Sequence, residues 1–369
     1  MKLIMQPDDG PGPILSALKN AKKSVEIAIF RFDRSDLETT LKDVAAKGVK
    51  VTALVADINR GGEKNLRQLE TRFLDAGITV ARTADDLIRY HNKMIIVDRR
   101  TLFMLSFNFT HLDIDHSRGF GIVTKNASLV QEAVQLFECD CARRPYTAGP
   151  GTFVVSPANS RKVLRDFLKR AKKQLLIYDP QISDKEMIRI LQERGKAGVD
   201  VRIIGKIGVG SNLAVQKLTR MRLHTRTIIR DRHQAFVGSQ SLRPAELDSR
   251  RELGLIIRES KIVKKLLATF ESDWGTTNAV HEVPKQLKDE EVIKDPVNQK
   301  ETEKALASLV QELHPLTDTV AKAVKKISAQ AGGPILTNKM VKSTVKKVVK
   351  KAVKQAVKAA ARDSKRRKG

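Results

Sequence analysis

An internal repeat constrains the fold of this chain more than any other feature. The segment "LKNAKKSVEIAIFRFDRSDLETTLKDVAAKGVKVTALV", from Leu18, parallels "LKRAKKQLLIYDPQISDKEMIRILQERGKAGVDVRIIG", from Leu168. In each copy a helix ending in Ala-Lys-Lys precedes an apolar strand, and a second helix ends at Gly48 or Gly198 before another strand. Strand, helix and strand in that order form a βαβ unit, which predicts a mainly parallel sheet flanked by helices.

The repeat continues through a second pair of segments. "HNKMIIVDRRTLFMLSFNFT" from His91 and "HTRTIIRDRHQAFVGSQSLR" from His224 share His at position zero, a cation at two, Asp at seven and Ser at fifteen. Apolar residues on both sides of a short polar turn predict a β-hairpin in each copy, with its tip at 98–100 or 231–233. The copies end alike, in "GFGIVTKNASLVQEAVQLFECDC" and "ELGLIIRESKIVKKLLATFESDW".

The predicted fold class is therefore α/β, with two homologous domains at 1–147 and 148–276. Beyond Trp274 the chain is charged, punctuated by proline and nearly free of aromatic residues. That composition predicts a charged linker with short helices over 277–330. Residues 331–369 are expected to form a lysine-rich tail, helical or disordered.

The net charge of the chain is strongly positive, at +27. Thirteen basic residues and one acid lie in the stretch from Asn338 to Gly369. This excess predicts an anionic partner, with nucleic acid favoured and an anionic phospholipid surface as the alternative. The apolar stripe of the tail contains Val and Ala instead of the Trp, Phe or Leu of membrane-surface helices. A solvated tail without a dedicated partner is the competing interpretation. The tail residues expected to bind the anion are Lys346, Lys347, Lys350, Lys351, Lys354, Arg366 and Arg367.

Other features bear on compartment and metal content. No apolar run approaches the roughly 18 residues of a membrane span, and the acidic, Pro/Gly-rich start does not resemble a secretory signal. The two cysteines, Cys139 and Cys141, do not suggest a disulfide framework, and two ligands alone do not complete a zinc site. We therefore expect a reducing, cytoplasmic location and no metal.

The first hairpin brings together groups suited to phosphate chemistry. His91 and Lys93 are two residues apart and point to one side of a strand, and the returning strand brings Ser106 and Asn108 to the same end. The lysine can neutralise phosphate oxygens, the serine and asparagine can orient them, and a neutral imidazole can attack phosphorus. Asp98 lies at the turn tip, where we expect it to cap the turn.

Together the two motifs resemble a known signature. "HNKMIIVD" followed by "SFNFT" resembles the His-x-Lys-x4-Asp motif of the phospholipase D superfamily, and "LHTRTIIRD" followed by "GSQS" resembles an altered second copy. The resemblance covers roughly residues 10–276. It implies one active site between the halves, where one histidine forms a phosphohistidine and the other protonates the leaving oxygen, without a cofactor. The residues assigned in this way are His91, Lys93, His224 and Arg226 for catalysis, Ser106, Asn108, Ser239 and Ser241 for phosphate binding, and Asp98, Asp231 and Glu252 for structural support.

The second copy departs from the superfamily pattern. Arg226 replaces the lysine and Ser241 the asparagine, while in the first copy Leu105 replaces a glycine and Gly119 stands where the second copy has Glu252. Arginine keeps the charge but is longer and planar. Retained catalysis with a rebuilt phosphate site is the favoured interpretation, and a degenerate phosphate-binding site is the alternative.

The aromatic and basic side chains near the motifs indicate the substrate less clearly than the tail does. Phe30, Phe32, Phe107 and Phe109 are expected to pack in the core, where they would not stack on bases. An opening bordered by arginines such as Arg220, Arg222 and Arg226 would suit a polyanion.

These observations predict a metal-independent phosphodiesterase of the phospholipase D type. Nucleic acid is favoured as its substrate, and hydrolysis or transphosphatidylation of phospholipid is the alternative. A third hypothesis is a DNA-binding protein that keeps the fold as a scaffold. One chain carries both motifs, so a monomer is sufficient for the site. The sequence leaves open which histidine is the nucleophile.

Overall fold

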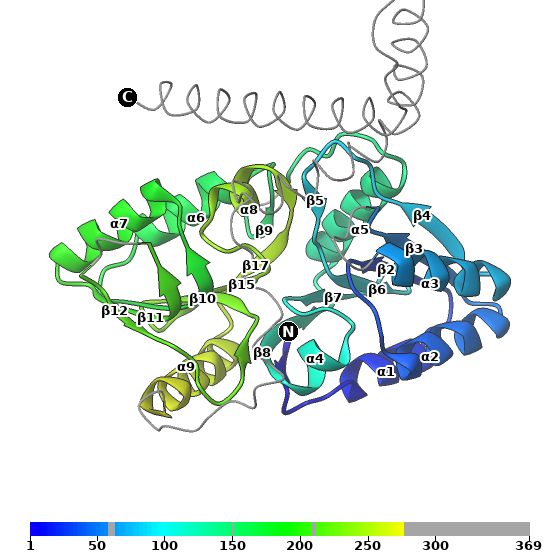
Figure 1. The fold of residues 1–369 in the computed structure, drawn as a ribbon, viewed down its shortest axis with the longest axis horizontal. Coiled ribbons are helices and arrows are strands. Elements are labelled where there is room, and N and C mark those ends of the chain that lie inside the picture. Colours follow the sequence, from blue (N-terminus) through cyan, green and yellow to red (C-terminus); the bar gives the residue numbers. More distant parts are fainter. Residues whose placement is uncertain (58–62, 150, 209–211, 277–369) are drawn as a thin grey trace, which may run out of the picture. The chain divides into compact units, whose positions relative to one another are not determined.

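The structure is a computed structural model that describes residues 1–57, 63–149, 151–208 and 212–276 (Figure 1). Each repeat builds one large sheet with helices packed on it, so the α/β class and the two-repeat organisation are confirmed. Both repeats belong to one compact unit, Met1–Lys288. The linker and tail predictions lie outside the described residues, and the division of the repeats after residue 147 remains a proposal.

The first repeat (blue to teal in Figure 1) has the strand order β1-β8-β7-β6-β2-β3-β4. Its helices are α1 (Gly12–Lys19), α2 (Ser35–Ala46), α3 (Glu63–Asp75), α4 (His111–Asp115) and α5 (Ala127–Cys141). Its strands are β1 (Lys2–Gln6), β2 (Ser24–Ile29), β3 (Lys50–Val55), β4 (Thr79–Arg82), β5 (Arg89–Tyr90), β6 (Met94–Val97), β7 (Thr101–Leu105) and β8 (Ser117–Thr124).

The second repeat (green to yellow) has the order β12-β11-β10-β14-β15-β17-β9. Its helices are α6 (Ser160–Lys169), α7 (Lys185–Lys196), α8 (Pro244–Asp248) and α9 (Ser260–Thr276). Its strands are β9 (Phe153–Val155), β10 (Gln174–Ile182), β11 (Asp200–Ile207), β12 (Ala214–Gln216), β13 (Arg222–Leu223), β14 (Arg226–Arg230), β15 (Gln234–Gly238), β16 (Arg250–Arg251) and β17 (Leu253–Ile257).

The sheets are mixed, which corrects the expectation that they would be mainly parallel. The βαβ units give the parallel pairs β2–β3 and β10–β11, as predicted. The hairpins then join the same sheets, and the strands of a hairpin must run in opposite directions. The predicted helix ends are correct, because Gly48 and Gly198 follow α2 and α7 with φ of +85° each, a conformation that glycine adopts without a steric penalty.

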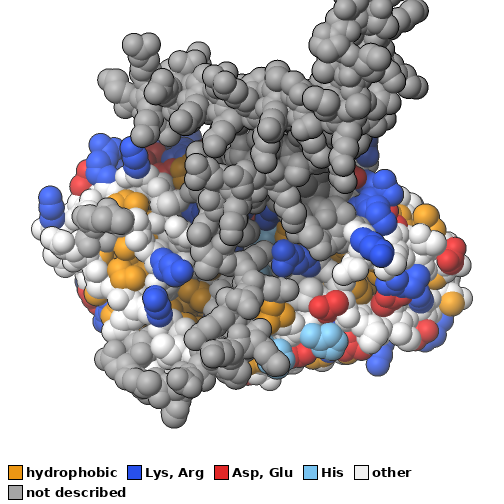
Figure 2. All heavy atoms as spheres, in the orientation of Figure 1, with side chains coloured by type: hydrophobic (Ala, Val, Ile, Leu, Met, Phe, Trp, Pro, Cys, Tyr) orange, Lys and Arg blue, Asp and Glu red, His pale blue; other side chains and the backbone are white. Residues whose placement is uncertain are grey.

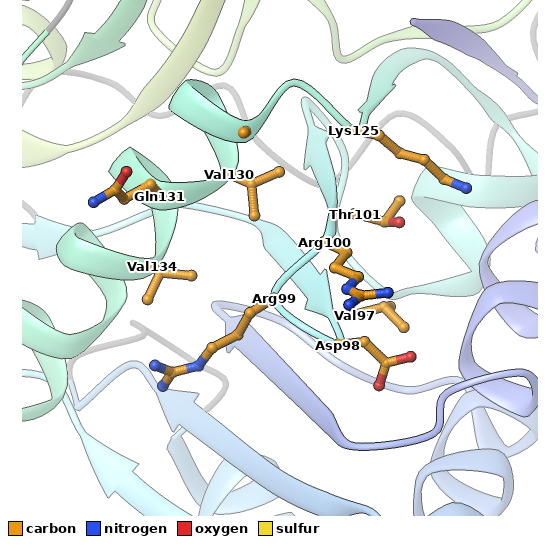
Figure 3. Close-up of a pocket in the computed structure, with 10 residues that line it drawn as sticks. Val97, Asp98, Arg99, Arg100, Thr101, Lys125, Val130, Gln131 and Val134 are labelled. Atoms are coloured by element: carbon orange, nitrogen blue, oxygen red, sulfur yellow. The ribbon is translucent and has the colours of Figure 1, made fainter.

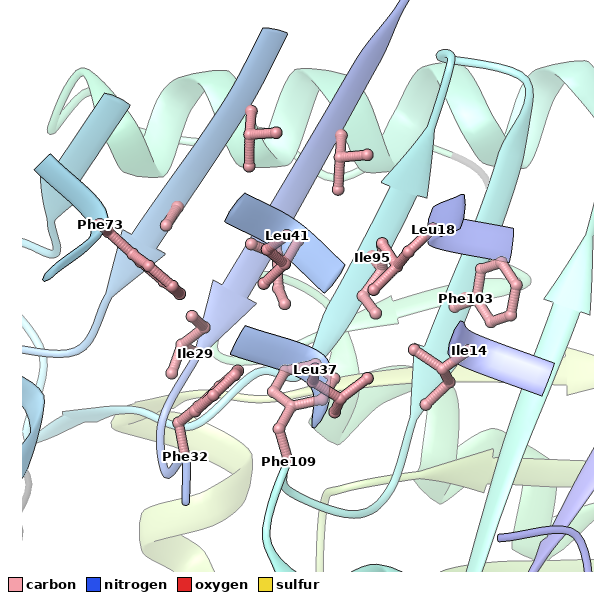
Figure 4. Packing of buried hydrophobic residues seen from close by; sticks show 14 of the residues in the cluster. Ile14, Leu18, Ile29, Phe32, Leu37, Leu41, Phe73, Ile95, Phe103 and Phe109 are labelled. Carbon is pink, nitrogen blue, oxygen red and sulfur yellow. The ribbon is translucent and has the colours of Figure 1, made fainter. Parts of the chain in front are cut away.

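The strands contain continuous apolar runs because both faces of each sheet are covered. Along β6 and β7, Ile95 and Phe103 face α1 and α2 (Figure 4), while Ile96 and Met104 belong to a second cluster. That second cluster combines residues of both sheets with the apolar faces of α5 and α9. The two repeats therefore share this second cluster, and its packing holds them together.

Candidate active site

The tips of both predicted hairpins carry an aspartate with positive φ, 54° at Asp98 and 51° at Asp231. The Asp98 carboxylate does not cap its own turn as expected. It accepts the main-chain N–H groups of residues 22–24, the closest at 2.6 Å, where α1 leads into β2. Asp231 binds residues 172–174 in the same way. Burial acts to raise the pKa of Asp98, but these hydrogen bonds outweigh it and hold the pKa below its ordinary value. Both aspartates therefore anchor the sheet and lie at the hairpin end remote from the histidines.

At the other end of each hairpin, the histidine is held by the main chain of the opposite repeat. The N–H of His91 donates to the carbonyl of Arg251 at 2.8 Å, and the N–H of His224 donates to that of Arg118 at 3.1 Å. Two short parallel pairings continue this contact, β5 with β16 and β13 with β8. The relationship is reciprocal, since Arg118 and Arg251 occupy the same position in the two repeats. Both histidines therefore lie at the junction of the repeats.

The side chains of these two arginines reinforce the junction. Arg118 pairs with Asp273 of α9 at 2.9 Å, and Arg251 pairs with Asp140 of α5 at 3.0 Å. Each pair is buried and joins one repeat to the last helix of the other. Tyr178 adds a hydrogen bond to Asp273 at 2.7 Å. Breaking a buried pair of this kind leaves an uncompensated charge, so the junction is sensitive to the loss of either partner.

The imidazole of His91 is buried and contacts a carboxylate, an ammonium group and an aromatic ring. Its Nδ1 lies 2.9 Å from Oε2 of Glu252, a residue of the second repeat. Lys93 Nζ lies 2.8 Å from Nε2 and 2.9 Å from Nδ1. Since an ammonium only donates, we assign the lone pair to Nε2 and the N–H to Nδ1, which donates to Glu252. The Phe30 ring packs edge-on against the imidazole with centroids 4.5 Å apart.

The imidazole of His224 has a different environment. Its Nε2 lies 3.5 Å from Oδ2 of Asp113, a residue of the first repeat. Its Nδ1 is buried and has no hydrogen-bond partner among the described residues. Asp113 in turn accepts hydrogen bonds from Asn108 Nδ2 at 2.6 Å and Arg222 Nη1 at 2.6 Å. The two histidines thus meet carboxylates of opposite repeats through different ring nitrogens.

Arg226 and Ser241, the two residues that depart from the superfamily pattern in the second copy, contact each other. Its Nε donates to Ser241 Oγ at 3.1 Å, and its Nη1 donates to the His224 carbonyl at 2.7 Å. Glu246 lies 4.0 Å from the same guanidinium and accepts the Ser241 N–H at 2.7 Å. The guanidinium therefore links Ser241 to the His224 main chain, and its charge stays next to His224.

The two motif serines are bonded within their sheets. Phe120 donates its N–H to Ser106 Oγ at 2.9 Å, and Leu253 donates its N–H to Ser239 Oγ at 3.1 Å. Both hydroxyls therefore join a hairpin to the next strand, and their predicted role in phosphate binding stays a prediction.

Burial and a shared set of cations govern the protonation of both histidines. Burial followed by Lys93 and Arg226 lowers the pKa of His91 well below its ordinary value. Burial followed by Arg222, Arg226 and Lys93 does the same to His224. Lys93 and Arg226 act on both rings, so the two imidazoles have a common electropositive environment. Burial and Glu246 raise the pKa of Glu252 to about 8. A neutral imidazole can attack phosphorus or take up a proton from a reactant.

Comparison with protein-family models agrees with the two-repeat arrangement of the site. The model of the "Cardiolipin synthase, PLD-like domain" family matches residues 14–141 and 164–274, which covers both repeats. The chain belongs to the phospholipase D superfamily. Members of this superfamily transfer phosphoryl groups or cleave phosphodiesters. No curated protein sequence gives a significant match.

Solved structures share the fold at low sequence identity. Polyphosphate kinase from Porphyromonas gingivalis is 18% identical with a TM-score of 0.64, over 74% of this chain and 50% of the kinase, so the chain spans half the kinase's length. Phosphatidylserine synthase from Haemophilus influenzae is 14% identical with a TM-score of 0.58, over 85% of this chain and 94% of the synthase. The phospholipase D family member Nuc from Salmonella typhimurium is 22% identical with a TM-score of 0.36, over 40% of this chain and 97% of Nuc.

A separate hollow lies on the surface of the first repeat. A hollow of about 690 Å³ next to the first hairpin tip is lined by Asp98, Arg99, Arg100 and Lys125 (Figure 3), and neither histidine borders it. On the face in Figure 2, Lys and Arg side chains are spread over both repeats. Within the described ranges no group of three or more His, Cys, Asp or Glu is placed to hold a metal ion. No helix in the described part of the chain is both long and apolar enough to cross a membrane.

Sequence reasoning missed several residues of this site. Phe30 was assigned to the core alone, yet it also packs on His91. Asp113 was given no role, although it lies 3.5 Å from His224. Arg222 was expected only at the border of the opening, and it donates a hydrogen bond to Asp113. The repeat contained one signal, since Asp113 and Glu246 follow their histidines at the same distance in sequence. Phe32, Phe107 and Phe109 are core residues, as predicted.

Proposed function

We propose that the protein is a phosphodiesterase of the phospholipase D type that acts through a phosphohistidine on His91, with nucleic acid as its substrate. One observation carries this proposal: a buried histidine from each repeat lies at the junction of the repeats, and Lys93 and Arg226 act electrostatically on both rings. A phosphodiester anion bound by these cations would meet an imidazole of each repeat. Survival of both histidines argues against a degenerate scaffold.

The geometry supports distinct steps for the two histidines. The lone pair on Nε2 of His91 attacks phosphorus, while the Nδ1–H bond to Glu252 at 2.9 Å keeps the ring in the required tautomer. Lys93 and Arg226 neutralise the charge that grows on the phosphoryl oxygens. Asn108 is held near His224 by its hydrogen bond to Asp113. His224 protonates the leaving oxygen and later takes a proton from the attacking water.

The choice of substrate rests on charge. The chain carries a formal charge of +27, and the cations Arg222 and Arg226 adjoin His224. Every phosphate along a polyanion is attracted by this positive charge. A single lipid head group, in contrast, interacts only with the cations next to the histidines. Phospholipid is the second candidate, because the matching family model is that of a cardiolipin synthase domain.

The proposal is tested by incubating the full-length protein with single-stranded DNA, RNA and cardiolipin vesicles in the presence of EDTA. We expect cleavage of nucleic acid that is lost in His91→Ala and in His224→Ala. His111→Ala is the matched control, since this exposed histidine on α4 is not part of the site, and it should retain activity. Release of a lipid product with intact nucleic acid selects the second candidate. Cleavage that persists in His91→Ala, or that EDTA abolishes, contradicts the proposed mechanism.

The basic tail has its own test. Deletion of residues 331–369 removes the lysine-rich segment from Asn338 to Gly369. We expect weaker binding of long DNA and a flatter dependence of its affinity on salt concentration, because fewer counterions are released. Turnover of a dinucleotide, which is too short to contact the tail and the site together, should be unchanged. Equal affinities with and without the tail contradict its assignment as an anion-binding segment.

A further inference from the structure

The two histidines receive their carboxylates from positions that do not correspond. Glu252 of the second repeat reaches His91, but the corresponding residue of the first repeat is Gly119. A Cβ atom at Gly119 would lie 2.9 Å from Cδ1 and 3.2 Å from Cβ of Phe107. Phe107 is completely buried, so it cannot move aside. The first repeat therefore cannot offer His224 a carboxylate from the position that serves His91.

Asp113 approaches His224 from a different element. It is the third residue of α4, where its N–H bonds to the Thr110 side chain at 3.2 Å. Its Oδ2 accepts the main-chain N–H of Asn108 at 2.8 Å and lies 3.5 Å from His224 Nε2. Its Oδ1 accepts Arg222 Nη1 at 2.6 Å. The side chains of Asp113 and His224 are each 3% exposed, so water does not screen their interaction.

The corresponding residue of the second repeat behaves differently. Glu246 binds the Ser241 N–H and approaches the arginines Arg226 and Arg250, all within its own repeat. Asp113 alone of this pair extends across the junction to a histidine. The contact is thus specific to the first repeat.

The charges around His224 make a carboxylate necessary for its proton. Burial opposes protonation of the His224 ring. Four nearby cations oppose it as well, namely Arg222, Arg226, Lys93 and Arg31. Among the described residues, Asp113 is the acid within 4.0 Å of the ring. It lies at Nε2, whereas Nδ1 of His224 has no hydrogen-bond partner in the described ranges. A proton is therefore best stabilised on Nε2.

We propose that Asp113 is the positioning residue that keeps the proton on Nε2 of His224 and so makes this histidine the acid, leaving His91 as the nucleophile. The inference rests on the proposed function. The P–Nε2 bond to His91 forms as the P–O bond to the leaving group breaks, and the leaving oxygen takes the Nε2 proton of the His224 imidazolium, which the Asp113 carboxylate and the bound phosphodiester anion stabilise. His224 is left as the neutral ring with its remaining proton on Nδ1. In the second step, His224 Nε2 removes a proton from water, the water oxygen bonds to phosphorus, and the P–N bond breaks.

The leaving group provides a kinetic test. Nitrophenolate leaves without a proton, whereas the alkoxide of a dinucleotide requires one. In Asp113→Asn we expect dinucleotide cleavage to fall by about 10²–10⁴-fold. The first release of nitrophenol from bis(p-nitrophenyl) phosphate should change by less than about 10-fold, and trapped phosphohistidine should accumulate. Asp113→Glu retains the charge and should recover part of the dinucleotide activity. Asp115→Asn, which removes a half-buried carboxylate of the same helix that pairs with Arg34, should leave both reactions unchanged.

A measurement without substrate separates this inference from the proposed function. ¹⁵N spectra of the imidazoles should show His224 protonated at Nε2 in the wild type and shifted toward Nδ1 in Asp113→Asn. Equal slowing of both diesters, or an unchanged His224 tautomer in the variant, overturns the role of Asp113. If the wild type cleaves neither diester while the tautomer shifts as expected, the proposed function fails and the assignment of Asp113 to the His224 proton stands.

Discussion

The main-chain N–H of His91 donates a hydrogen bond to the carbonyl oxygen of Arg251 at 2.8 Å, and these two residues belong to different repeats. The backbone of one catalytic candidate is therefore held by the other half of the molecule. Since the Arg251 side chain is fixed by Asp140, the geometry of the site depends on a buried ion pair at the junction.

That dependence predicts a large effect of Asp140→Ala. The substitution leaves the Arg251 guanidinium buried without its partner, and we expect a loss of about 3–5 kcal/mol of unfolding free energy together with lower activity. Glu138→Ala on the same helix removes a half-exposed acid that pairs with Arg99, and it should cost about 0–1 kcal/mol. Urea unfolding at pH 7.5 measures both. If both variants lost a similar amount of unfolding free energy, the buried pair would stabilise the protein no more than the exposed pair does.

The contact of Arg226 with Ser241 predicts that these residues function as a pair. Arg226→Lys loses the 3.1 Å bond to Ser241, and Ser241→Asn crowds the guanidinium. The double variant restores the Lys and Asn of the first repeat. We expect each single variant to lower kcat/KM by about 10-fold, and the double variant to lose less than the two combined, with a coupling of about 0.5–3 kcal/mol. Arg189→Lys, on the exposed face of α7, is the control. Additive losses contradict the pairing.

The close approach of Phe107 to Gly119 predicts an intolerance of any side chain at this position. In Gly119→Ala, the new Cβ would lie 2.9 Å from Phe107 Cδ1, and we expect a loss of about 1–3 kcal/mol. Gly12→Ala adds a Cβ with nothing within 4 Å and should change stability by no more than about 0.5 kcal/mol. Adding Phe107→Leu to Gly119→Ala should recover part of the loss. Thermal unfolding measures the stability of these variants. A Gly119→Ala protein as stable as the wild type would refute the steric argument.

The raised pKa of Glu252 predicts how stability changes with pH. Burial and Glu246 raise this pKa to about 8, so the folded protein holds the proton more tightly than the unfolded chain does. The resulting stabilisation is complete below the ordinary carboxyl pKa and is lost as the pH rises to about 8. Between about pH 5 and 8, the free energy of unfolding should fall more steeply with pH in the wild type than in Glu252→Gln. The difference in slope should be about 1.4 kcal/mol per pH unit.

Urea unfolding of both proteins at several pH values measures this difference, because the groups that they share largely cancel. A stability difference that does not vary with pH contradicts the assignment of a proton to Glu252.

Much of the fold follows from local patterns in the chain. The βαβ units, the hairpins and the helix ends at Gly48 and Gly198 depend on periodicity and turn chemistry, which are properties of neighbouring residues. The repeat also paired His91 with His224, and the resemblance to the phospholipase D superfamily implied one site that needs both. Mixed strand directions were not foreseen, because joining the hairpin to the βαβ sheet is a long-range choice.

The sequence by itself determined the two-repeat α/β architecture, the pair of histidines and the cations beside them. Only the tertiary structure decided which carboxylate serves which histidine, because Glu252 and Asp113 reach their partners across the junction of the repeats. It also decided that Asp98 anchors a neighbouring loop instead of its own turn. Such contacts depend on the distance between residues far apart in the chain, and spacing along a sequence carries no information about that distance.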